Sequence, residues 1–255
     1  EALRPGKIIN IEEIIVSPKV IETEKNLGNF VIEEKELIDY IHQNKDRLKK
    51  HCLKYEDSSI YMGYYNCHWE KEGYGILILK DGSKYQGFFK ENKMNGQGRL
   101  VGIEGDYYEG EFKDDKANNL GKYVNKQGGI YVGNWLEDKQ HGFGEEILFD
   151  GSYYKGEYYQ GYRNGAGKFI WKDGSYYKGK FVKNLIQGEG VYKWREGKIF
   201  YGNWENNKMN GKGLFLWKDK KKYYGEYKND KKIGLGIFHW ADGRQYRGEW
   251  NNGKQ

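Results

Sequence analysis

The residue types that could perform catalysis are scattered along these 255 residues rather than grouped. The five histidines show no metal-ligand spacing, and Cys52 and Cys67 form no Cys-x-x-Cys motif. A Cys67–His68 nucleophile and base would need both side chains on one side of the chain. Adjacent strand residues point to opposite faces, so a loop position is favoured for the pair. We therefore expect no catalytic residue and no metal site.

Glycine-rich motifs could cradle a phosphate, but their context here is unsuitable. The recurring Gly-x-Gly pairs are not followed by a third glycine that opens a helix, and no Gly-Lys-Ser or Gly-Lys-Thr occurs. Serines in the glycine-rich part fall at expected turns, away from any histidine base. The sequence therefore predicts a protein without a cofactor that is not an enzyme.

Aromatic side chains interleaved with lysines could bind nucleic acid or lipid. Phe, Trp and Tyr make up 17% of the chain, and 43 Lys+Arg stand against 37 Asp+Glu. The acidic residues are mixed among the basic ones, so no stripe of one sign is available for phosphates, and we expect no nucleic-acid partner. The best basic cluster could attract anionic lipid only weakly, and membrane binding is not favoured. That cluster, the candidate basic contact, is Lys220, Lys221 and Lys222, with Lys218 beside it.

The composition changes near residue 56. Of the 37 glycines, all but Gly6 and Gly28 come later, as do all 8 tryptophans, while both prolines come earlier. No run of about 20 apolar residues predicts a membrane span. The first residue is Glu and no signal sequence opens the chain, so we expect a segment of a longer protein. Two cysteines without a disulfide framework favour an intracellular compartment.

A repeat of 23 residues runs through the later region. The unit aromatic-x-Gly-x-aromatic begins at Tyr61, Tyr85, Tyr108, Tyr131, Tyr154, Tyr177, Phe200, Tyr223 and Tyr246. Glycine recurs at offsets 2, 11, 13 and 20 within the units, and the ninth unit is incomplete. Such self-similarity is the signature of a repeat architecture.

The spacing within each unit predicts two strands. Residues two apart share one face of a strand, which places the repeated rings together on one side. Asp-Gly steps such as Asp150-Gly151 are hairpin signals, because Gly accepts a positive φ. The opposite face carries charged residues such as Lys155, Glu157 and Lys178 and is expected to be solvated. The predicted fold is all-β: an elongated single-layer antiparallel meander of about eight β-hairpins, one per 23-residue repeat.

The repeat resembles the membrane occupation and recognition nexus (MORN) repeat. The unit Tyr131–Gly151, YVGNWLEDKQHGFGEEILFDG, carries the family's glycine and aromatic spacing, and the resemblance covers roughly residues 61–255. It implies a non-catalytic rod that serves as a scaffold, as in ciliary radial-spoke and other cytoskeletal proteins and in membrane-junction proteins. Some members are attached to lipid kinases or methyltransferases.

The region before the repeats reads as two further parts. Residues 1–32, which contain Pro18, are expected to form an extended N-terminal arm. Residues 33–55 are expected to form an amphipathic helix, with glutamates at its start and lysines at its end. We favour a capping role for the helix at the first sheet edge, with partner docking as the alternative, and partner docking for the arm. The docking residues would be Ile9, Ile11, Ile14 and Ile15 in the arm and Leu37, Ile41 and Leu48 in the helix. Residues 56–255 form the repeat array.

The functional hypothesis is a structural rod that binds partner segments in an aromatic groove. Other proteins of a large assembly are the expected partners, and the resemblance to MORN proteins makes the ciliary axoneme the best single location; a homo-oligomer is left open. The alternatives are a membrane-junction or phosphoinositide-binding module, or the regulatory part of a larger enzyme. The same rings would otherwise serve only internal packing of the sheet. The groove residues would be Tyr108, Tyr131, Trp135, Tyr154, Tyr158, Trp171, Tyr177, Phe181, Trp194, Trp204, Trp217 and Trp240.

Overall fold

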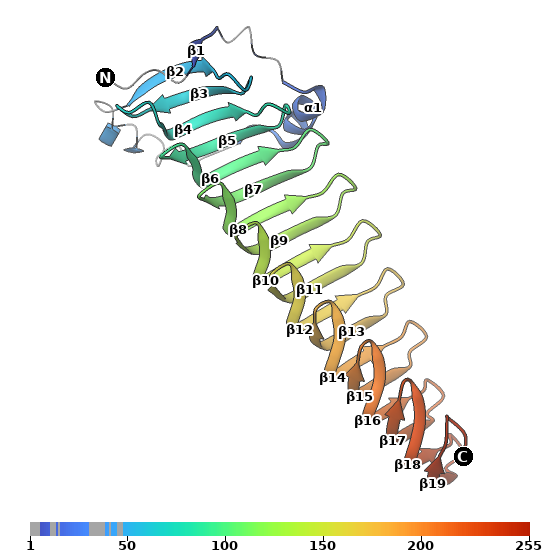
Figure 1. The fold of residues 1–255 in the computed structure, drawn as a ribbon. Coiled ribbons are helices and arrows are strands. Elements are labelled where there is room, and N and C mark those ends of the chain that lie inside the picture. Colours follow the sequence, from blue (N-terminus) through green and yellow to red (C-terminus); the bar gives the residue numbers. More distant parts are fainter. Residues whose placement is uncertain (1–5, 11–13, 15, 31–38, 41, 45–47) are drawn as a thin grey trace. The chain divides into compact units, whose positions relative to one another are not determined.

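The chain is almost entirely antiparallel β-structure, as the repeat predicts (Figure 1). The computed structural model describes residues 6–10, 14, 16–30, 39–40, 42–44 and 48–255. It divides into two compact units, Glu1–Lys139 and Gln140–Gln255. Each unit is described by itself.

In the first unit, successive strands pair with their sequence neighbours, so the sheet is a meander. Its elements are β1 (Lys7–Ile8), α1 (Pro18–Leu27), β2 (Lys49–Lys54), β3 (Ile60–Tyr65), β4 (Lys71–Ile78), β5 (Lys84–Lys90), β6 (Lys93–Val101), β7 (Tyr107–Lys113), β8 (Lys116–Val124) and β9 (Ile130–Leu136).

The second unit has the same construction. Its strands are β10 (Lys139–Ile147), β11 (Tyr153–Tyr159), β12 (Tyr162–Ile170), β13 (Tyr176–Val182), β14 (Leu185–Lys193), β15 (Ile199–Glu205), β16 (Lys208–Leu216), β17 (Lys222–Lys228), β18 (Lys231–His239) and β19 (Gln245–Trp250).

The tight hairpin turn lies at the opposite end of each 23-residue repeat from the Asp-Gly step, where the sequence predicts it. From the repeat of Tyr85 onward, the polar segment after the second aromatic residue of the repeat is a two-residue turn with both residues at positive φ, such as Asn206 (49°) and Asn207 (65°). Turns of this kind match the twist of the strands that they join. The Asp-Gly step instead lies in a longer connection: Leu148 and Ser152 are joined by a backbone hydrogen bond, and Asp150 Oδ1 accepts from the Ser152 N–H (2.8 Å).

Each tight turn is also hydrogen-bonded to the preceding repeat. Asn184 donates its N–H to the carbonyl of Arg163 (3.0 Å), and its side-chain oxygen accepts from the Arg163 N–H (2.8 Å). Asn207 makes the same pair of bonds with Ile186 (3.1 and 2.7 Å). We call this two-bond contact the turn clamp. It ties neighbouring hairpins together at a point where the strands alone would leave backbone groups unpaired.

The N-terminal region departs from the expected extended arm. Residues Pro18–Leu27 form helix α1, with Pro at its start and Gly28 at positive φ (74°) after its end. That arrangement is a helix signal in its own right, whereas the alternating isoleucines around it are typical of an extended chain.

The expected helix over 33–55 is also partly wrong. Asp39, Tyr40 and residues 42–44 are helical, but Lys49–Lys54 form strand β2, which pairs with β3. An unpaired edge at β3 would leave a row of N–H and C=O groups without partners, and this demand overrides the helical charge order. Capping of the first repeat therefore comes from a strand.

The predicted docking residues of the arm contact the protein's own sheet. Ile9 is 7% exposed and packs with Ile60 and Ile78, and Ile14 packs against the same cluster. Leu48 is half-buried. The expectation that these isoleucines dock on a partner is thus wrong for Ile9. Ile11, Ile15, Leu37 and Ile41 lie outside the described residues.

No helix in the part of the chain that the structure describes is long and apolar enough to cross a bilayer.

Candidate functional site: the two faces of the repeat sheet

Glycines form the floor on which the first ring of each repeat lies. Gly156 and Gly167 face each other across β11 and β12, and the ring of Tyr154 lies over both. A Cβ on Gly167 would stand 2.7 Å from two ring atoms of Tyr154, closer than carbon atoms can approach. The glycines at offsets 2 and 13 are therefore required because a ring occupies the space of their side chains. We call this side of the sheet the ring face and the other side the back face.

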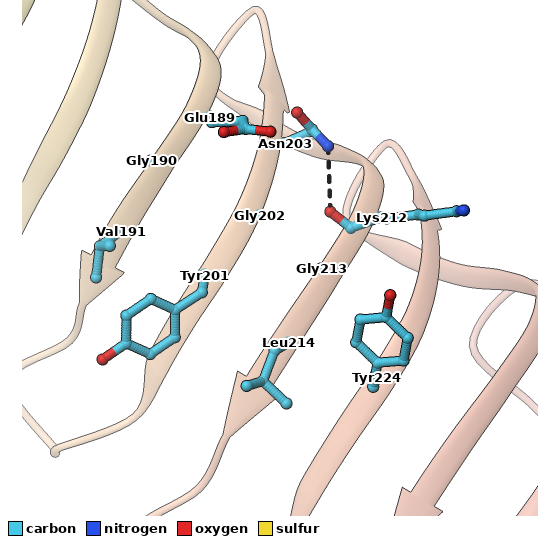
Figure 2. A pocket seen from close by; sticks show the side chains of 10 residues that line it. All are labelled: Glu189, Gly190, Val191, Tyr201, Gly202, Asn203, Lys212, Gly213, Leu214 and Tyr224. Carbon is cyan, nitrogen blue, oxygen red and sulfur yellow. Dashed lines mark hydrogen bonds between the residues drawn. The ribbon is translucent and has the colours of Figure 1, made fainter.

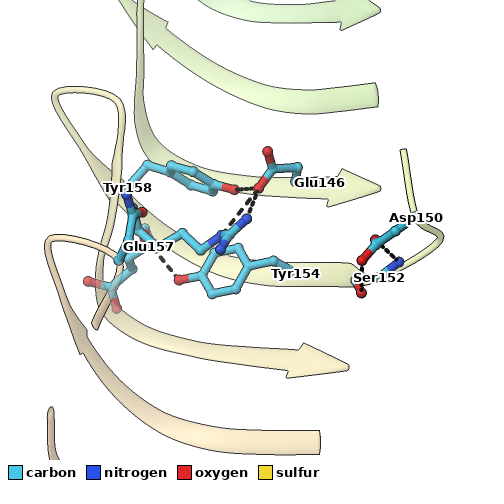
Figure 3. Close-up of polar contacts among 8 residues, drawn as sticks. Glu146, Asp150, Ser152, Tyr154, Glu157 and Tyr158 are labelled. Atoms are coloured by element: carbon cyan, nitrogen blue, oxygen red, sulfur yellow. Dashed lines mark hydrogen bonds and ion pairs between the residues drawn. The ribbon is translucent and has the colours of Figure 1, made fainter. Parts of the chain in front are cut away.

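The hydroxyl of the first ring is satisfied within its own repeat. Tyr154 donates to the carbonyl of Glu157 (3.0 Å), as Figure 3 shows. Tyr85, Tyr131 and Tyr246 make the corresponding bond to the residue three positions later (2.9, 2.9 and 3.0 Å). Burial raises the pKa of Tyr85 and Tyr154, and it raises that of Tyr177 to about 12.

The second ring of each repeat packs edge-on between two first rings. Phe181 meets Tyr177 and Tyr154 with centroids 5.2 Å apart in both cases and nearly perpendicular planes. Trp204 meets Phe200 and Tyr177 at 5.2 and 5.7 Å. Edge-to-face contacts of this kind contribute beyond their buried area. The alternating row is the hydrophobic core of each single-layer unit.

Because of this packing, a partner could contact only some of the residues that were predicted to line the groove. Seven of the proposed residues are 7% exposed or less and offer no ring surface to a partner: Tyr108, Tyr131, Tyr154, Tyr158, Tyr177, Phe181 and Trp204. For these seven the internal-packing alternative holds. The other five, Trp135, Trp171, Trp194, Trp217 and Trp240, are half-buried. Trp135 donates from its indole nitrogen to the carbonyl of Gly121 (3.1 Å) and packs in the core row of the first unit.

A row of rings, half-buried except for Phe169 (7% exposed), runs along the ring face of the second unit, beside the core row. Trp171 meets Tyr192 at 4.9 Å, and Trp194 stacks on Phe215 at 5.3 Å. We call the set the Trp ladder; its members are Phe169, Trp171, Tyr192, Trp194, Phe215, Trp217, Phe238 and Trp240. The period-two spacing of these aromatics is visible in the sequence, but only their exposure distinguishes them from the core rings.

Lys71, Arg163 and Lys232 lie against aromatic rings instead of in solvent. Lys232 Nζ stands 4.5 to 5.1 Å from the centroids of four rings, and desolvation lowers its pKa. The four rings are Trp217, Tyr223, Phe238 and Trp250. Such cation–π contacts compensate in part for the lost hydration.

Arg163 occupies the same position as Lys232, three repeats earlier in the sequence, and has a carboxylate as its partner. Its guanidinium lies over Tyr154 and Phe169 (5.2 and 4.8 Å) and pairs with Glu146 at 2.6 Å. Glu146 also accepts from the hydroxyl of Tyr158 (2.9 Å), a contact visible in Figure 3. Ring, cation and carboxylate together make a part-buried network in which each polar group has a partner.

The proposed basic contact is weaker than its sequence suggests. Lys221 pairs with Asp219 at 2.8 Å, which neutralises part of the charge of Lys220, Lys221 and Lys222.

The Cys67–His68 pair lies in a loop: Cys67 Sγ and His68 Nδ1 are 3.6 Å apart in an exposed connection between β3 and β4. Among the described residues there is no group of three or more His, Cys, Asp or Glu placed to hold a metal ion.

The back face is not uniformly charged. Lys155 and Lys178 are exposed there, as expected. Farther along, Tyr201 and Tyr224 are 43% and 54% exposed on the same face, with Leu214 between them. The sequence signal for this change is the residue after the first ring, which is Lys in the two preceding repeats (Lys155 and Lys178) and Tyr in these two.

Sequence comparison agrees with this repeat architecture. The model of the MORN repeat family matches residues 85–107, 108–130, 131–153, 154–176, 177–199, 200–222, 223–243 and 246–255. These matches cover most of the chain, and the protein belongs to the MORN repeat family. MORN repeats are non-catalytic and imply a protein-interaction or scaffold role. Comparison with curated proteins gives no match.

Solved structures show a lower level of similarity. The TCP10 domain of Danio rerio CPAP in complex with a peptide of Danio rerio STIL aligns with a TM-score of 0.45 and 7% identity, over 81% of this chain and 91% of that one. The same domain without peptide gives 0.44 and 8%, over 78% and 93%. The TCP domain of Drosophila melanogaster SAS-4, bound to a proline-rich motif of Ana2, gives 0.36 and 8%, over 79% and 90%.

Proposed function

We propose that this protein is a structural scaffold in a cytoskeletal assembly, with the ciliary axoneme as its location. In this role the repeats act as a rigid support, and partner proteins bind segments of themselves to the ring face. The observation that carries the proposal is the Trp ladder. It is a continuous row of large rings that are half-buried from Trp171 to Trp240, and surfaces with clustered aromatics are favoured at protein interfaces.

The ladder is suited to binding because its rings are already held in place. Trp194 is fixed between Tyr192 (4.4 Å) and Phe215 (5.3 Å) before any partner arrives. A partner would therefore bury aromatic surface without the cost of ordering flexible side chains. The core row beneath supplies the rigidity, so binding and folding depend on different rings.

The proposal is tested by capture of partners with a ladder variant. Trp194→Ala with Trp217→Ala should remove the captured proteins, because these rings are central to the ladder. The matched control is Tyr159→Ala with Tyr162→Ala, two exposed rings at the opposite end of the strands (54% and 49%). Equal capture by both double variants would contradict the proposal.

The axonemal location is tested separately. A tagged full-length chain should localise along the cilium and remain with the axoneme after detergent extraction. Detergent-soluble protein that floats with phosphoinositide vesicles through Lys220, Lys221 and Lys222 would favour a membrane-associated module and overturn the proposed location.

A further inference from the structure

A second apolar surface lies on the back face of the second unit. Cross-strand neighbours on β14 to β17 place Val191, Tyr201, Leu214 and Tyr224 in one row, which Figure 2 shows. Over the glycines beside this row is a hollow of about 510 Å³. Ile237 on β18 continues the row. We call these five residues the back-face row.

The first unit shows what covers such a row. On its back face, Met62 and Ile76 are cross-strand partners, as Tyr201 and Leu214 are in the second unit. Residues of the N-terminal region lie against this place: Ile14 and Val16 line a cavity with Met62 and Ile76.

The covering segment continues into α1, which packs on the next strands. Val20 of the helix is fully buried against Val101 and Tyr107. Glu24 of the same helix pairs with Lys84 at 2.7 Å, with both side chains largely buried. The back face of the first unit is thus covered by an aliphatic segment that leads into helix α1. The carboxylate of Glu24 in that helix pairs with Lys84, the first residue of β5.

The second unit repeats the features that receive this occupant. Lys222 stands directly before the first ring of its repeat, as Lys84 does, and beside the back-face row. Between the two apolar places no apolar row forms: the cross-strand pairs at the same positions include Gln86–Arg99 and Lys155–Lys168, and Val132 stands opposite Lys122. A lysine directly before the first ring, Lys84 or Lys222, is therefore found next to each of the two apolar places.

We propose that the back-face row of the second unit is a docking site for a partner protein's aliphatic segment that carries an acidic residue, of the type that Ile14–Glu24 provides in the first unit. The row would bury the aliphatic side chains, and Lys222 would receive the carboxylate. Apolar burial supplies the affinity and the lysine fixes the direction of the segment. The ring face is not involved, so this site is independent of the Trp ladder.

The test uses a fluorescein-labelled peptide with the sequence of residues 14–27 as the probe and the full chain as the receptor. We expect saturable binding by anisotropy, weakened about tenfold or more by Leu214→Glu, because a charge replaces a buried contact. Tyr224→Ser is the second variant, at an exposed position where folding should be unaffected. Val132→Glu is the matched control: it stands one residue after a first ring, as Tyr201 does, and is 49% exposed.

A charge exchange tests the orientation. Lys222→Glu should weaken the peptide, and a peptide with Glu24→Lys should recover binding to that variant only. Absence of saturable binding, or binding unchanged by Leu214→Glu and Tyr224→Ser, would overturn the proposal. A dimer of the full chain that Leu214→Glu abolishes would assign the face to a second copy, and vesicle binding lost in the same variant would assign it to a membrane; either result also overturns it.

Discussion

At the residue scale, the first ring and its two glycines form the unit on which the repeat depends. The ring of Tyr154 needs the space above Gly156 and Gly167, and its hydroxyl needs the carbonyl of Glu157. The spacing of these residues was readable in the sequence. The glycines next to each ring also indicated where the ring lies, but that the ring is thereby buried and closed to partners was not readable, because period two assigns a face but not a depth.

A methyl group on the glycine floor should destabilise the protein more than one in a loop. Gly167→Ala would place its Cβ against the ring of Tyr154, with an expected loss of about 2–3 kcal/mol. Gly174→Ala, at φ 85° with nothing within 4 Å of the added Cβ, should cost only about 1 kcal/mol. Urea unfolding measures both. Equal losses would show that the ring does not need this floor.

Removal of the first-ring hydroxyl should have a smaller effect. Tyr154→Phe keeps the edge-to-face packing and loses the 3.0 Å bond to Glu157, an expected cost of about 1 kcal/mol. Phe200 stands at the equivalent position and shows that the ring alone is accepted. Tyr159→Phe, at an exposed ring, is the control and should leave thermal stability unchanged. A loss as large as that of Gly167→Ala would contradict this account.

At the element scale, the turn clamp joins consecutive hairpins. Its sequence signal is an Asn or Asp at the second turn position, which has an obvious role in accepting positive φ. The second role, hydrogen bonding to a residue 21 positions earlier, could not be predicted from local propensity. For the same reason local sequence predicts a helix where β2 forms: the pairing of β2 with β3 is a demand of the sheet edge rather than of its own sequence.

The clamp should contribute measurably to the coupling between repeats. Asn207→Gly keeps the turn geometry but removes the side-chain acceptor for the Ile186 N–H (2.7 Å). Asn206→Gly relaxes the turn in the same way without touching this bond. We expect Asn207→Gly to be about 1 kcal/mol less stable than Asn206→Gly. Asn207→Asp should behave as the native residue, since Asp230 makes the same contact with Met209. Urea titration decides, and indistinguishable glycine variants would exclude an energetic role for the clamp.

At the scale of the whole molecule, the buried tyrosines make stability depend on alkaline pH. Burial raises the pKa of Tyr177 and Tyr223 from 10.0 to about 12, and shifts Tyr61, Tyr85 and Tyr227 in the same direction. In the unfolded chain they ionise near 10. The unfolded state then binds fewer protons than the folded one, so this contribution is complete below pH 10 and is lost as pH rises above it.

We therefore expect cooperative alkaline unfolding. Tyrosinate absorbance should rise in two steps, first from exposed tyrosines near pH 10 and then, together with loss of β-sheet circular dichroism, from the buried ones. Lys232, whose pKa is lowered by burial, acts in the opposite sense, because its charge is a penalty that disappears as pH rises. A single tyrosine transition near pH 10 with the sheet intact would contradict the burial described here.

We propose above that the Trp ladder of the folded protein is a protein-binding surface. The most direct measurement is site-specific photo-cross-linking in the source cell, with a photoreactive amino acid at Trp171 and, as control, at the exposed Leu120. We predict protein adducts from position 171 that disappear when Trp194 and Trp217 are both replaced by Ala, and no such adduct from position 120. Adducts that persist in the double variant, or equal adducts from both positions, would contradict the claim.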